Sequence, residues 1–340
     1  MINNYIIILI KLIIFLIFSL LILSKNLYAC LNDIFNNYNL NNKTKVALCT
    51  MGKKENLYAK QFVDYYINLG IDHIFIYDDN EEGSERISSC IPKIYKEKVT
   101  IYENIKSYIK KQSHAFTKCY YNNYKKFDWL LMIDMDEYLY IINNTLKSYL
   151  MDKSLDKCDF VKFHTVIPTD NNLIHYDERF LLERFKGPYI KQFDIKTIIR
   201  GNITNLIYNI HSPSSSPQRN ITCNNKGDII YDKDINLGLL MPINLDKAFI
   251  IHFKYKSTEE FINKYQRGYS NWFSEKENNL VLNTKLKGFF LTNEITLEKI
   301  DYIERKLHLN LSSFKNDFNN LINSYKTNII NNSLNISILY

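Results

Sequence analysis

Apolar positions after residue 45 fall into short, nearly continuous runs that alternate with longer segments of helical period. Residues 46–50 have the pattern of a buried strand. Residues 57–69 carry apolar or aromatic side chains at a helical period, and Gly70 follows as the residue that ends such a helix. Residues 71–77 form a second strand pattern, so the sequence predicts a strand, a helix and a parallel strand.

The same alternation continues along the chain. Strands are expected at residues 99–102 and 159–166, and a helix is expected over about residues 112–124. The regular exchange of strands and helices predicts an α/β fold built on a doubly wound, mainly parallel and twisted sheet flanked by helices.

A later strand and helix are expected near residue 250. Residues 249–255 form the strand, and Ser257-Thr258-Glu259-Glu260 is a capping box with Ser257 as N-cap and Glu260 at N3. The helix that it opens should run toward Gly268. Residues after about 310 alternate Asn with Ile and Leu, which indicates a peripheral helix or a frayed tail.

The N-terminus carries a long apolar run, residues 6–23, in which Lys11 is the one charged residue. At about 18 residues it reaches the lower limit for a membrane helix. A cleaved signal peptide, cut within residues 27–30, is the alternative, but normal apolar cores of about 7–15 residues are shorter, which favours an uncleaved anchor. The expected protein is therefore a single-pass type II membrane protein of the secretory pathway, Golgi-like in a eukaryote. Its expected parts are a signal anchor or signal peptide (1–23), a stem (24–44), a folded domain (45–310) and a tail (311–340).

Composition places the chain in the globular class, because 340 residues with 46% hydrophobic content can bury one large core or two modest ones. The net charge of +7 fits an anionic ligand such as a nucleotide diphosphate, and it also fits a solubilising surface. The absence of any helix-turn-helix, zinc-finger or RNA-binding pattern argues against nucleic acid as a partner. The six cysteines lack metal-site spacing and permit disulfides of open pairing, while Cys49 is expected to be an ordinary core residue.

The most informative stretch is residues 129–138, where an apolar run ends on Asp134, Asp136 and Glu137. Open α/β sheets bind ligands just beyond the carboxyl ends of their strands. Two aspartates one residue apart at such an end can direct their oxygens at one point, which suits a divalent cation that also holds a diphosphate. Solvated turn residues are the alternative. A calcium loop is excluded, because the third Asx, the Gly and the distal Glu of that motif are missing.

Six passages, in order and spacing, resemble glycosyltransferase family 92 and its close GT-A relatives: residues 51–56, 65–74, 77–80, 129–138, 183–185 and 252–268. The resemblance implies a type II membrane protein with a GT-A fold that transfers galactose from a UDP donor, with inversion and with manganese. One departure is Lys54-Glu55-Asn56, where the family has Lys-Asn-Glu. It leaves the individual roles of Glu55 and Asn56 open.

The acidic motif matches the family's Asp-x-Asp-Glu-aromatic pattern. The resemblance implies that Asp134 contacts the ribose and the metal, that Asp136 is a metal ligand and that His252 completes the coordination. Imidazole beside carboxylates favours Mn²⁺ over Mg²⁺, because nitrogen ligands suit the transition metal. A half-buried histidine held in a strand by hydrogen bonds is the alternative for His252.

Further residues are assigned to the UDP-sugar. Asp78 and Asp79 end the second strand and are expected to bind uridine or ribose, although turn residues need no such function. Phosphate oxygens would be held by cations near the proposed metal site, and Arg267 is favoured over Lys254 and Lys264.

Inversion by single displacement needs a carboxylate that takes the proton from the acceptor hydroxyl. Glu183 is the first choice, and Asp177 or Glu178 are the alternates. A structural ion pair of Glu183 with Arg184 or Arg179 is an equal alternative.

The expected function is transfer of a hexose from a UDP-sugar to a glycan or glycoconjugate acceptor. A nucleotidyltransferase would explain the acids but not the N-terminal apolar segment. The non-enzymatic alternative is a membrane-anchored glycan-binding protein or a transferase fold without activity, supported only by the exchanged Glu55 and Asn56.

Overall fold

The structure is a computed structural model that describes residues 44–103, 111–208, 213–215, 220–231, 238–266, 275–316 and 318–334. Contacts divide the chain into residues 1–44 and a folded unit of residues 45–340. The expected membrane segment, residues 1–23, lies outside the described residues, as does the stem up to residue 43. Within the described ranges, no helix is long and apolar enough to cross a membrane.

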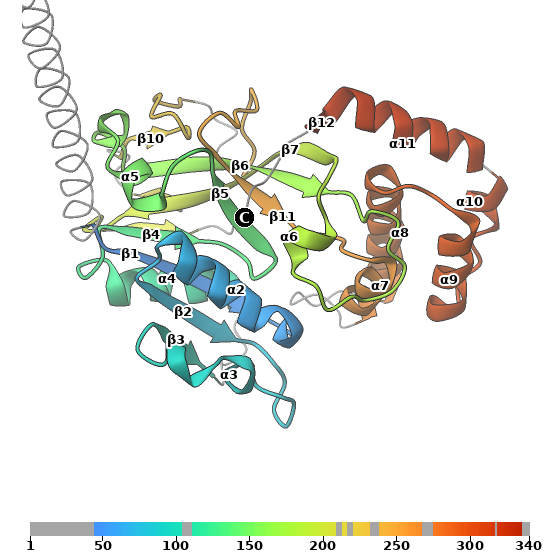
Figure 1. Ribbon diagram of the computed structural model, residues 1–340, viewed down its shortest axis with the longest axis horizontal. Helices are drawn as coiled ribbons and strands as arrows, with labels where there is room; N and C mark the ends of the chain where they lie inside the picture. The colour runs from blue at the N-terminus through green and yellow to red at the C-terminus, as the bar shows by residue number, and fades with distance from the viewer. Residues whose placement is uncertain are drawn as a thin grey trace, which may run out of the picture. The chain divides into compact units, whose positions relative to one another are not determined.

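A ten-stranded mixed sheet forms the centre of the folded unit (Figure 1). Its main path runs β3-β2-β1-β4-β7-β6-β11-β5, with β10 paired to β6 and β12 paired to β7. The strands are β1 (Val46–Gly52), β2 (His73–Asp78), β3 (Val99–Tyr102), β4 (Trp129–Met132), β5 (Glu137–Ile141), β6 (Phe160–Pro168), β7 (Tyr189–Arg200), β10 (Thr222–Cys223), β11 (Ala248–His252) and β12 (Ser333–Leu334). A separate hairpin pairs β8 (Leu206–Tyr208) with β9 (Pro213–Ser215).

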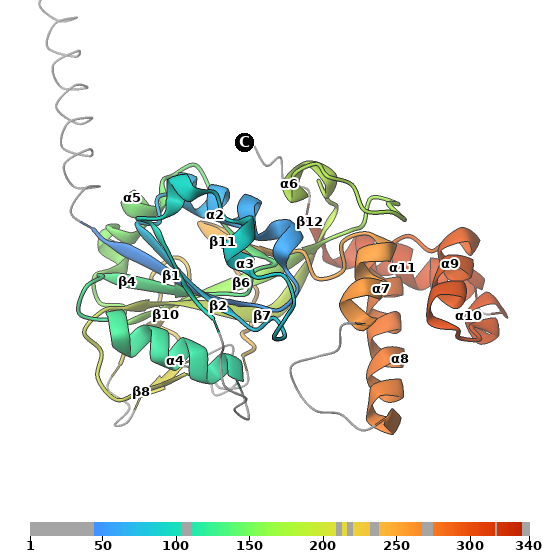
Figure 2. The same cartoon turned by 90° about the horizontal axis from the view of Figure 1, so that it is seen from below.

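Helices cover both faces of the sheet and one side of it. Helices α2 (Asn56–Leu69) and α5 (Leu146–Leu150) lie on one face and α4 (Lys111–Asn123) on the other (Figure 2). Helices α3 (Ile87–Cys90) and α6 (Leu181–Arg184) are short. The helices grouped beside the sheet are α7 (Thr258–Gln266), α8 (Glu275–Thr292), α9 (Leu297–Leu307), α10 (Ser312–Asn316) and α11 (Phe318–Asn332).

The N-terminal half of the sheet confirms the predicted parallel unit. β1 pairs in parallel with β2 and β4, and β2 pairs in parallel with β3. Gly70 ends α2 in the left-handed region at φ 107°, and its N–H bonds to the carbonyls of Tyr66 and Ile67. Helix α2 contributes Phe62 and Tyr66 to the core on its face of the sheet.

The apolar run ends before the acids as predicted, because β4 stops at Met132. The structure adds two strands that were not predicted, and the first of them, β5, begins at Glu137. Between β4 and β6 lies β7, an antiparallel strand that was not predicted, so the sheet is mixed more evenly than expected.

The capping box that opens α7 is confirmed. The Glu260 N–H donates to Ser257 Oγ at 3.3 Å, and the Ser257 N–H donates to Glu260 Oε2 at 3.1 Å. The strand before it is shorter than expected and ends at His252.

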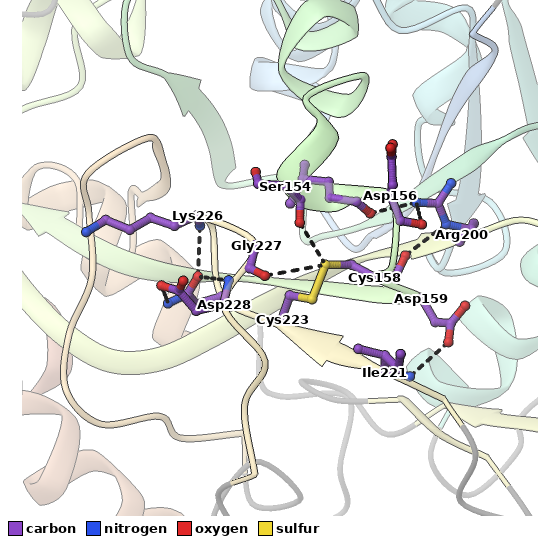
Figure 3. The surroundings of a disulfide bond; sticks show 12 residues. Ser154, Asp156, Cys158, Asp159, Arg200, Ile221, Cys223, Lys226, Gly227 and Asp228 are labelled. Carbon is purple, nitrogen blue, oxygen red and sulfur yellow. Dashed lines mark hydrogen bonds between the residues drawn. A yellow bond between two sulfur atoms is a disulfide. The ribbon is translucent and has the colours of Figure 1, made fainter.

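Two disulfides tie parts of the sheet to their surroundings. Cys49 of β1 is buried as expected, but it is bonded to Cys119 of α4 rather than being an ordinary core residue. Cys158, before β6, is bonded to Cys223 of β10, and the Ser154 and Gly227 carbonyls lie beside its sulfur (Figure 3).

The described part of the C-terminal region is mainly helical. After α10 and α11, β12 pairs antiparallel with the start of β7, with Ser333 opposite Ile190. Helices α7, α8 and α9 share an apolar cluster, to which Phe261, Phe289 and Ile303 belong.

Candidate active site

The acidic turn between β4 and β5 packs directly on the end of β1. A Cβ atom on Gly52 would lie 2.3 Å from the Met135 sulfur and 2.8 Å from Ile87 Cδ1, so a larger residue here would force these side chains to shift. The buried Met135 thereby anchors the middle of the turn, with Asp134 and Asp136 on either side of it. The glycine at the end of β1 therefore gives the acidic turn room to pack closely there.

Asp134 is engaged by two side chains. Its Oδ2 accepts from Lys196 Nζ at 2.7 Å, and its Oδ1 accepts from Gln112 Nε2. The Lys196 side chain is 2% exposed, whereas that of Asp134 is 29% exposed. Asp134 therefore contacts the buried Lys196 of β7, while its own side chain stays partly exposed after the end of β4.

Asp136 lies deeper and stays ionised. Burial by itself would raise its pKa, but the neighbouring Lys264 and His252 outweigh burial and hold the pKa well below its usual value. Lys264 Nζ forms an ion pair with Oδ2, and His252 Nε2 lies 3.7 Å from Oδ1.

Glu137 is the third acid of the turn. Burial, opposed by Lys196 and supported by Asp134, raises its pKa to about 7. Its Oε2 accepts from the Asp134 N–H at 3.0 Å and lies 3.1 Å from Lys196 Nζ. Its Oε1 has no hydrogen-bond partner among the described residues and lies 3.6 Å from His252 Nδ1.

The backbone brings His252 to these acids. His252, the last residue of β11, stands directly opposite Glu137, the first residue of β5. One residue further, the Phe253 N–H donates to the Asp136 carbonyl at 2.8 Å. The predicted association of His252 with the acidic motif is therefore present, while its role as a metal ligand stays a prediction.

The three proposed metal ligands do not all converge. Asp136 and His252 are neighbours, but Asp134 is turned to Lys196 and Gln112. Across the described ranges, no group of three or more His, Cys, Asp or Glu side chains is arranged to hold a metal ion. Asp136 and His252 are the pair that could do so.

The two acids assigned to uridine or ribose differ in what they contact. Both oxygens of Asp78 accept backbone N–H groups, from Asn80 at 2.9 Å and Ile87 at 2.8 Å, which holds the loop after β2. Asp79 Oδ1 pairs with Lys111 at 2.8 Å, and its buried Oδ2 has no hydrogen-bond partner within the described part of the chain. Asp79 therefore has a carboxylate oxygen without a donor, whereas both oxygens of Asp78 are engaged.

Lys264 and Lys254 lie beside Asp136, and Lys285 of α8 lies near these two lysines. Burial lowers the pKa of Lys254, and Asp194 and Lys264 are its next strongest influences. Burial also lowers the pKa of Lys285 on α8, with Lys254 and Lys264 adding to the effect. Of the cations expected from the sequence, Arg267 lies outside the described residues.

A second buried network fixes the start of α7. Arg184 makes two hydrogen bonds to Glu260, at 2.9 and 3.2 Å. Lys256 Nζ lies 3.4 Å from Glu55 Oε2 and 3.5 Å from the centre of the Tyr58 ring. Glu55 therefore acts as a buried partner of Lys256, and Arg184 pairs with Glu260 rather than with Glu183.

The proposed catalytic bases lie apart from this cluster. Glu183 is exposed on α6. Asp177 pairs with Arg179 at 2.6 Å, and hydrogen bonds from the Arg179 side chain and backbone lower its pKa to about 2. Among the interactions of the described residues, neither carboxylate bonds to Asp136 or His252.

Lys196 is a site residue that the sequence prediction missed. Its segment matches no motif, and the alternation of apolar and polar residues breaks directly after it, since Thr197 follows Lys196 and Ile198 and Ile199 are adjacent.

Comparisons with known proteins agree with the motifs. No protein-family model matches the chain. A glycosyltransferase family 92 protein of Ricinus communis is 28% identical over 97 residues, 28% of this chain and 17% of that protein. One of Oryza sativa subsp. japonica is 24% identical over 112 residues, 32% of this chain and 19% of that protein. The chain thus matches less than a fifth of the length of these relatives, and the resemblance to the family is confirmed.

Two solved structures align with this fold at low similarity. Staphylococcus aureus TarS 1–349 covers 84% of this chain and 90% of its own, with 14% identity and a TM-score of 0.32. HddC from Yersinia pseudotuberculosis covers 46% of this chain and 73% of its own, with 12% identity and a TM-score of 0.27.

Proposed function

We propose that the chain is a glycosyltransferase that moves a hexose, first of all galactose, from a UDP-sugar to a glycan acceptor with inversion. The observation that carries the proposal is the meeting of Asp136 and His252 beyond the end of β4. Such a strand end is where open α/β sheets bind nucleotides. The partial matches to family 92 proteins support the same class of enzyme.

A divalent ion fits this place by the chemistry of its donors. A carboxylate oxygen of Asp136 and Nε2 of His252 lie 3.7 Å apart. A carboxylate–imidazole set suits Mn²⁺ better than Mg²⁺. Asp136 and His252 would hold the ion, with Asp134 beside them, and the bound ion would neutralise charge that develops on the leaving UDP.

Lys264 supplies a positive charge of the chain's own at the same point. Its ammonium group pairs with Asp136 and also donates to the Lys254 carbonyl at 3.2 Å. A lysine ammonium is a compact charge on a flexible stem. Lys264 would therefore exchange Asp136 for a phosphate oxygen of the donor, and Lys254 would add to the field that holds the diphosphate.

Asp79 is the acid that we assign to the nucleoside. Its unpartnered, buried Oδ2 would accept a hydrogen bond from a ribose hydroxyl or the uracil N–H. Asp78 would act indirectly, by holding the loop that follows β2.

Glu183 remains our first choice for the base that deprotonates the acceptor. A base works best when its pKa lies near the operating pH. Asp177, with a pKa of about 2, is a poor base by this criterion because Arg179 stabilises its ionised form. Arg184 does not pair with Glu183, because it is bound to Glu260, and the arginine that interacts electrostatically with Glu183 is Arg179.

The anchor and its compartment belong to the same proposal. We place residues 1–23 in the membrane as a signal anchor and the folded unit in the secretory lumen. The two disulfides of the folded unit support this location, since such bonds persist in oxidising compartments.

The test is a screen of the full chain in detergent against a panel of UDP-sugars, with release of UDP as the readout. We expect turnover that requires Mn²⁺ and is largest with UDP-galactose. The Asp136→Asn variant should lose at least about a hundredfold in rate, because it removes a charged ligand at constant size. Reaction only with a nucleoside triphosphate, or no reaction with any UDP-sugar, would sink the proposal.

A further inference from the structure

Glu137 is a buried acid beside the two proposed metal ligands, Asp136 and His252, and the proposed function gives it no role. Its Oε2 is fixed by the Asp134 N–H at 3.0 Å and by Lys196 Nζ at 3.1 Å. These two donors come from the turn itself and from β7, so they hold the carboxylate in one rotation. The other oxygen, Oε1, must then point away from them.

Oε1 faces the imidazole of His252. It lies 3.6 Å from Nδ1, while Nε2 of the same ring lies 3.7 Å from Asp136. The Glu137 side chain is 1% exposed, and Oε1 has no hydrogen-bond partner among the described residues. A buried acceptor without a donor is costly, and Nδ1–H is the donor that this geometry offers.

The backbone holds the ring in place between the two acids. Glu137 and His252 are directly opposed in the antiparallel pair of β5 and β11, so their side chains emerge on the same face. The hydrogen bond from the Phe253 N–H to the Asp136 carbonyl continues this pairing into the turn. The imidazole therefore has one carboxylate on each nitrogen.

We propose that Glu137 is a positioning residue that accepts Nδ1–H of His252 and so presents the Nε2 lone pair, on the side of Asp136, to a divalent cation. Histidines that bind metals usually donate their other ring N–H to a carboxylate or carbonyl, which fixes the tautomer and the ring orientation. The cation belongs to the proposed function, whereas the orientation of the ring does not depend on it.

The opposite tautomer would leave Glu137 Oε1 without a donor and would turn its N–H toward Asp136, which already pairs with Lys264. With the proton on Nε2, the Nδ1 lone pair would face the buried Oε1, leaving two acceptors opposed without a hydrogen. The Nε2–H would also occupy the direction in which a cation must approach.

The first experiment reads the tautomer of the wild-type protein. Nitrogen-15 NMR of the metal-free full chain, labelled at histidine, is recorded at about pH 9, above the ordinary histidine pKa of about 6.5. Loss of one signal in His252→Gln assigns the ring. We expect the proton on Nδ1, and a proton on Nε2 would overturn the inference without any variant of Glu137 having to fold.

The second experiment uses Glu137→Gln. Lys196 and the Asp134 N–H require an oxygen, so the amide must turn its NH₂ group toward Nδ1 of His252. We expect the His252 proton to move to Nε2 and the affinity for Mn²⁺, measured by electron paramagnetic resonance, to fall about 10–100-fold. The control is Glu298→Gln, at an exposed position on α9, which should leave both readouts unchanged.

The two readouts separate this inference from the proposed function. A wild-type protein that binds no Mn²⁺ contradicts the proposed metal site, while the tautomer still decides the role of Glu137. A Glu137→Gln protein that folds, keeps its proton on Nδ1 and binds Mn²⁺ as tightly as the wild type removes Glu137 from the positioning role.

Discussion

At the scale of single residues, two of the described lysines are buried in the sheet, Lys196 and Lys162. Lys196 forms ion pairs with Asp134 and Glu137, and its side chain is 2% exposed. Lys162, also buried, donates to Thr197 Oγ1 at 2.8 Å on the neighbouring strand. Burial lowers the pKa of Lys162 to about 7.

Lys162→Met is expected to stabilise the protein below about pH 7. The pKa of Lys162 is about 7 in the folded protein, and it lies near 10.4 in an unfolded chain. The unfolded state therefore binds more protons between these values, so the wild-type protein gains stability as the pH rises through that range. The variant should lack this rise and be more stable at about pH 6 by an amount on the order of a few kcal/mol.

Urea denaturation at several pH values measures this effect. Lys157→Met, at an exposed position, is the matched control and should follow the wild-type profile. A Lys162→Met protein whose stability changes with pH as the wild type does would show that the lysine is not desolvated.

The family resemblance placed His252 beside Asp136, because the order of the motifs carried that information. It did not reveal that Asp78 is bound by two backbone amides, since turn geometry is not visible in residue types. Lys196 was missed because its partner Asp134 lies 62 residues away along the chain. Ion pairs between distant segments leave no local pattern.

At the scale of elements, a buried ion pair attaches the C-terminal helices to the sheet. Lys299, at the start of α9, lies 2.7 Å from Asp170, just after β6, and both side chains are 1% exposed. Lys299 also donates to the Glu294 carbonyl at 2.7 Å, and the Asp170 N–H donates to Asn293 at 2.6 Å. The start of α9 is thereby fixed to the loop after β6.

Lys299→Met is expected to destabilise the protein by about 3–5 kcal/mol, because it leaves the charge of Asp170 buried without a partner. The double variant Lys299→Met/Asp170→Asn should recover most of this loss, since neither charge remains. Thermal or urea unfolding of the three proteins measures both effects. A double variant no more stable than the single one would mean that the pair acts through packing rather than charge.

The parallel half of the sheet could be predicted because its strands are short apolar runs separated by one amphipathic helix. Strand β7 could not, since Lys191, Asp194 and Lys196 interrupt its apolar residues. The most buried of them, Lys196, is compatible with a central strand because Asp134 and Glu137 pair with it. Strand β5 was not predicted either, because it begins within the acidic motif that follows the apolar run.

At the scale of the whole molecule, two disulfides close long loops. They join residues separated by 70 and 65 positions, Cys49 with Cys119 and Cys158 with Cys223. In the chain-entropy account, such bonds stabilise a protein by restricting its unfolded state. The two disulfides therefore contribute to the stability of a sheet whose strands come from distant parts of the chain.

The variant Cys158→Ala/Cys223→Ala is expected to lose about 2–5 kcal/mol of unfolding free energy. Urea denaturation of wild type and variant, each with and without dithiothreitol, measures this loss. Cys90→Ala is the control, because Cys90 is unpaired among the described cysteines. An unchanged midpoint in the double variant would contradict the predicted contribution.

Strand β5 has β11 as its only partner on the main path of the sheet, and about 100 residues separate the two strands. During synthesis at about 5–20 residues per second, β5 would wait roughly 5–20 s for that partner to leave the ribosome. Glu137 and His252 belong to this pair, so the nascent chain cannot complete the acidic turn until nearly three quarters of it has been translated. An unfinished or truncated chain therefore leaves the edge of β5 unpaired and open to chaperones, and its acidic turn is incomplete.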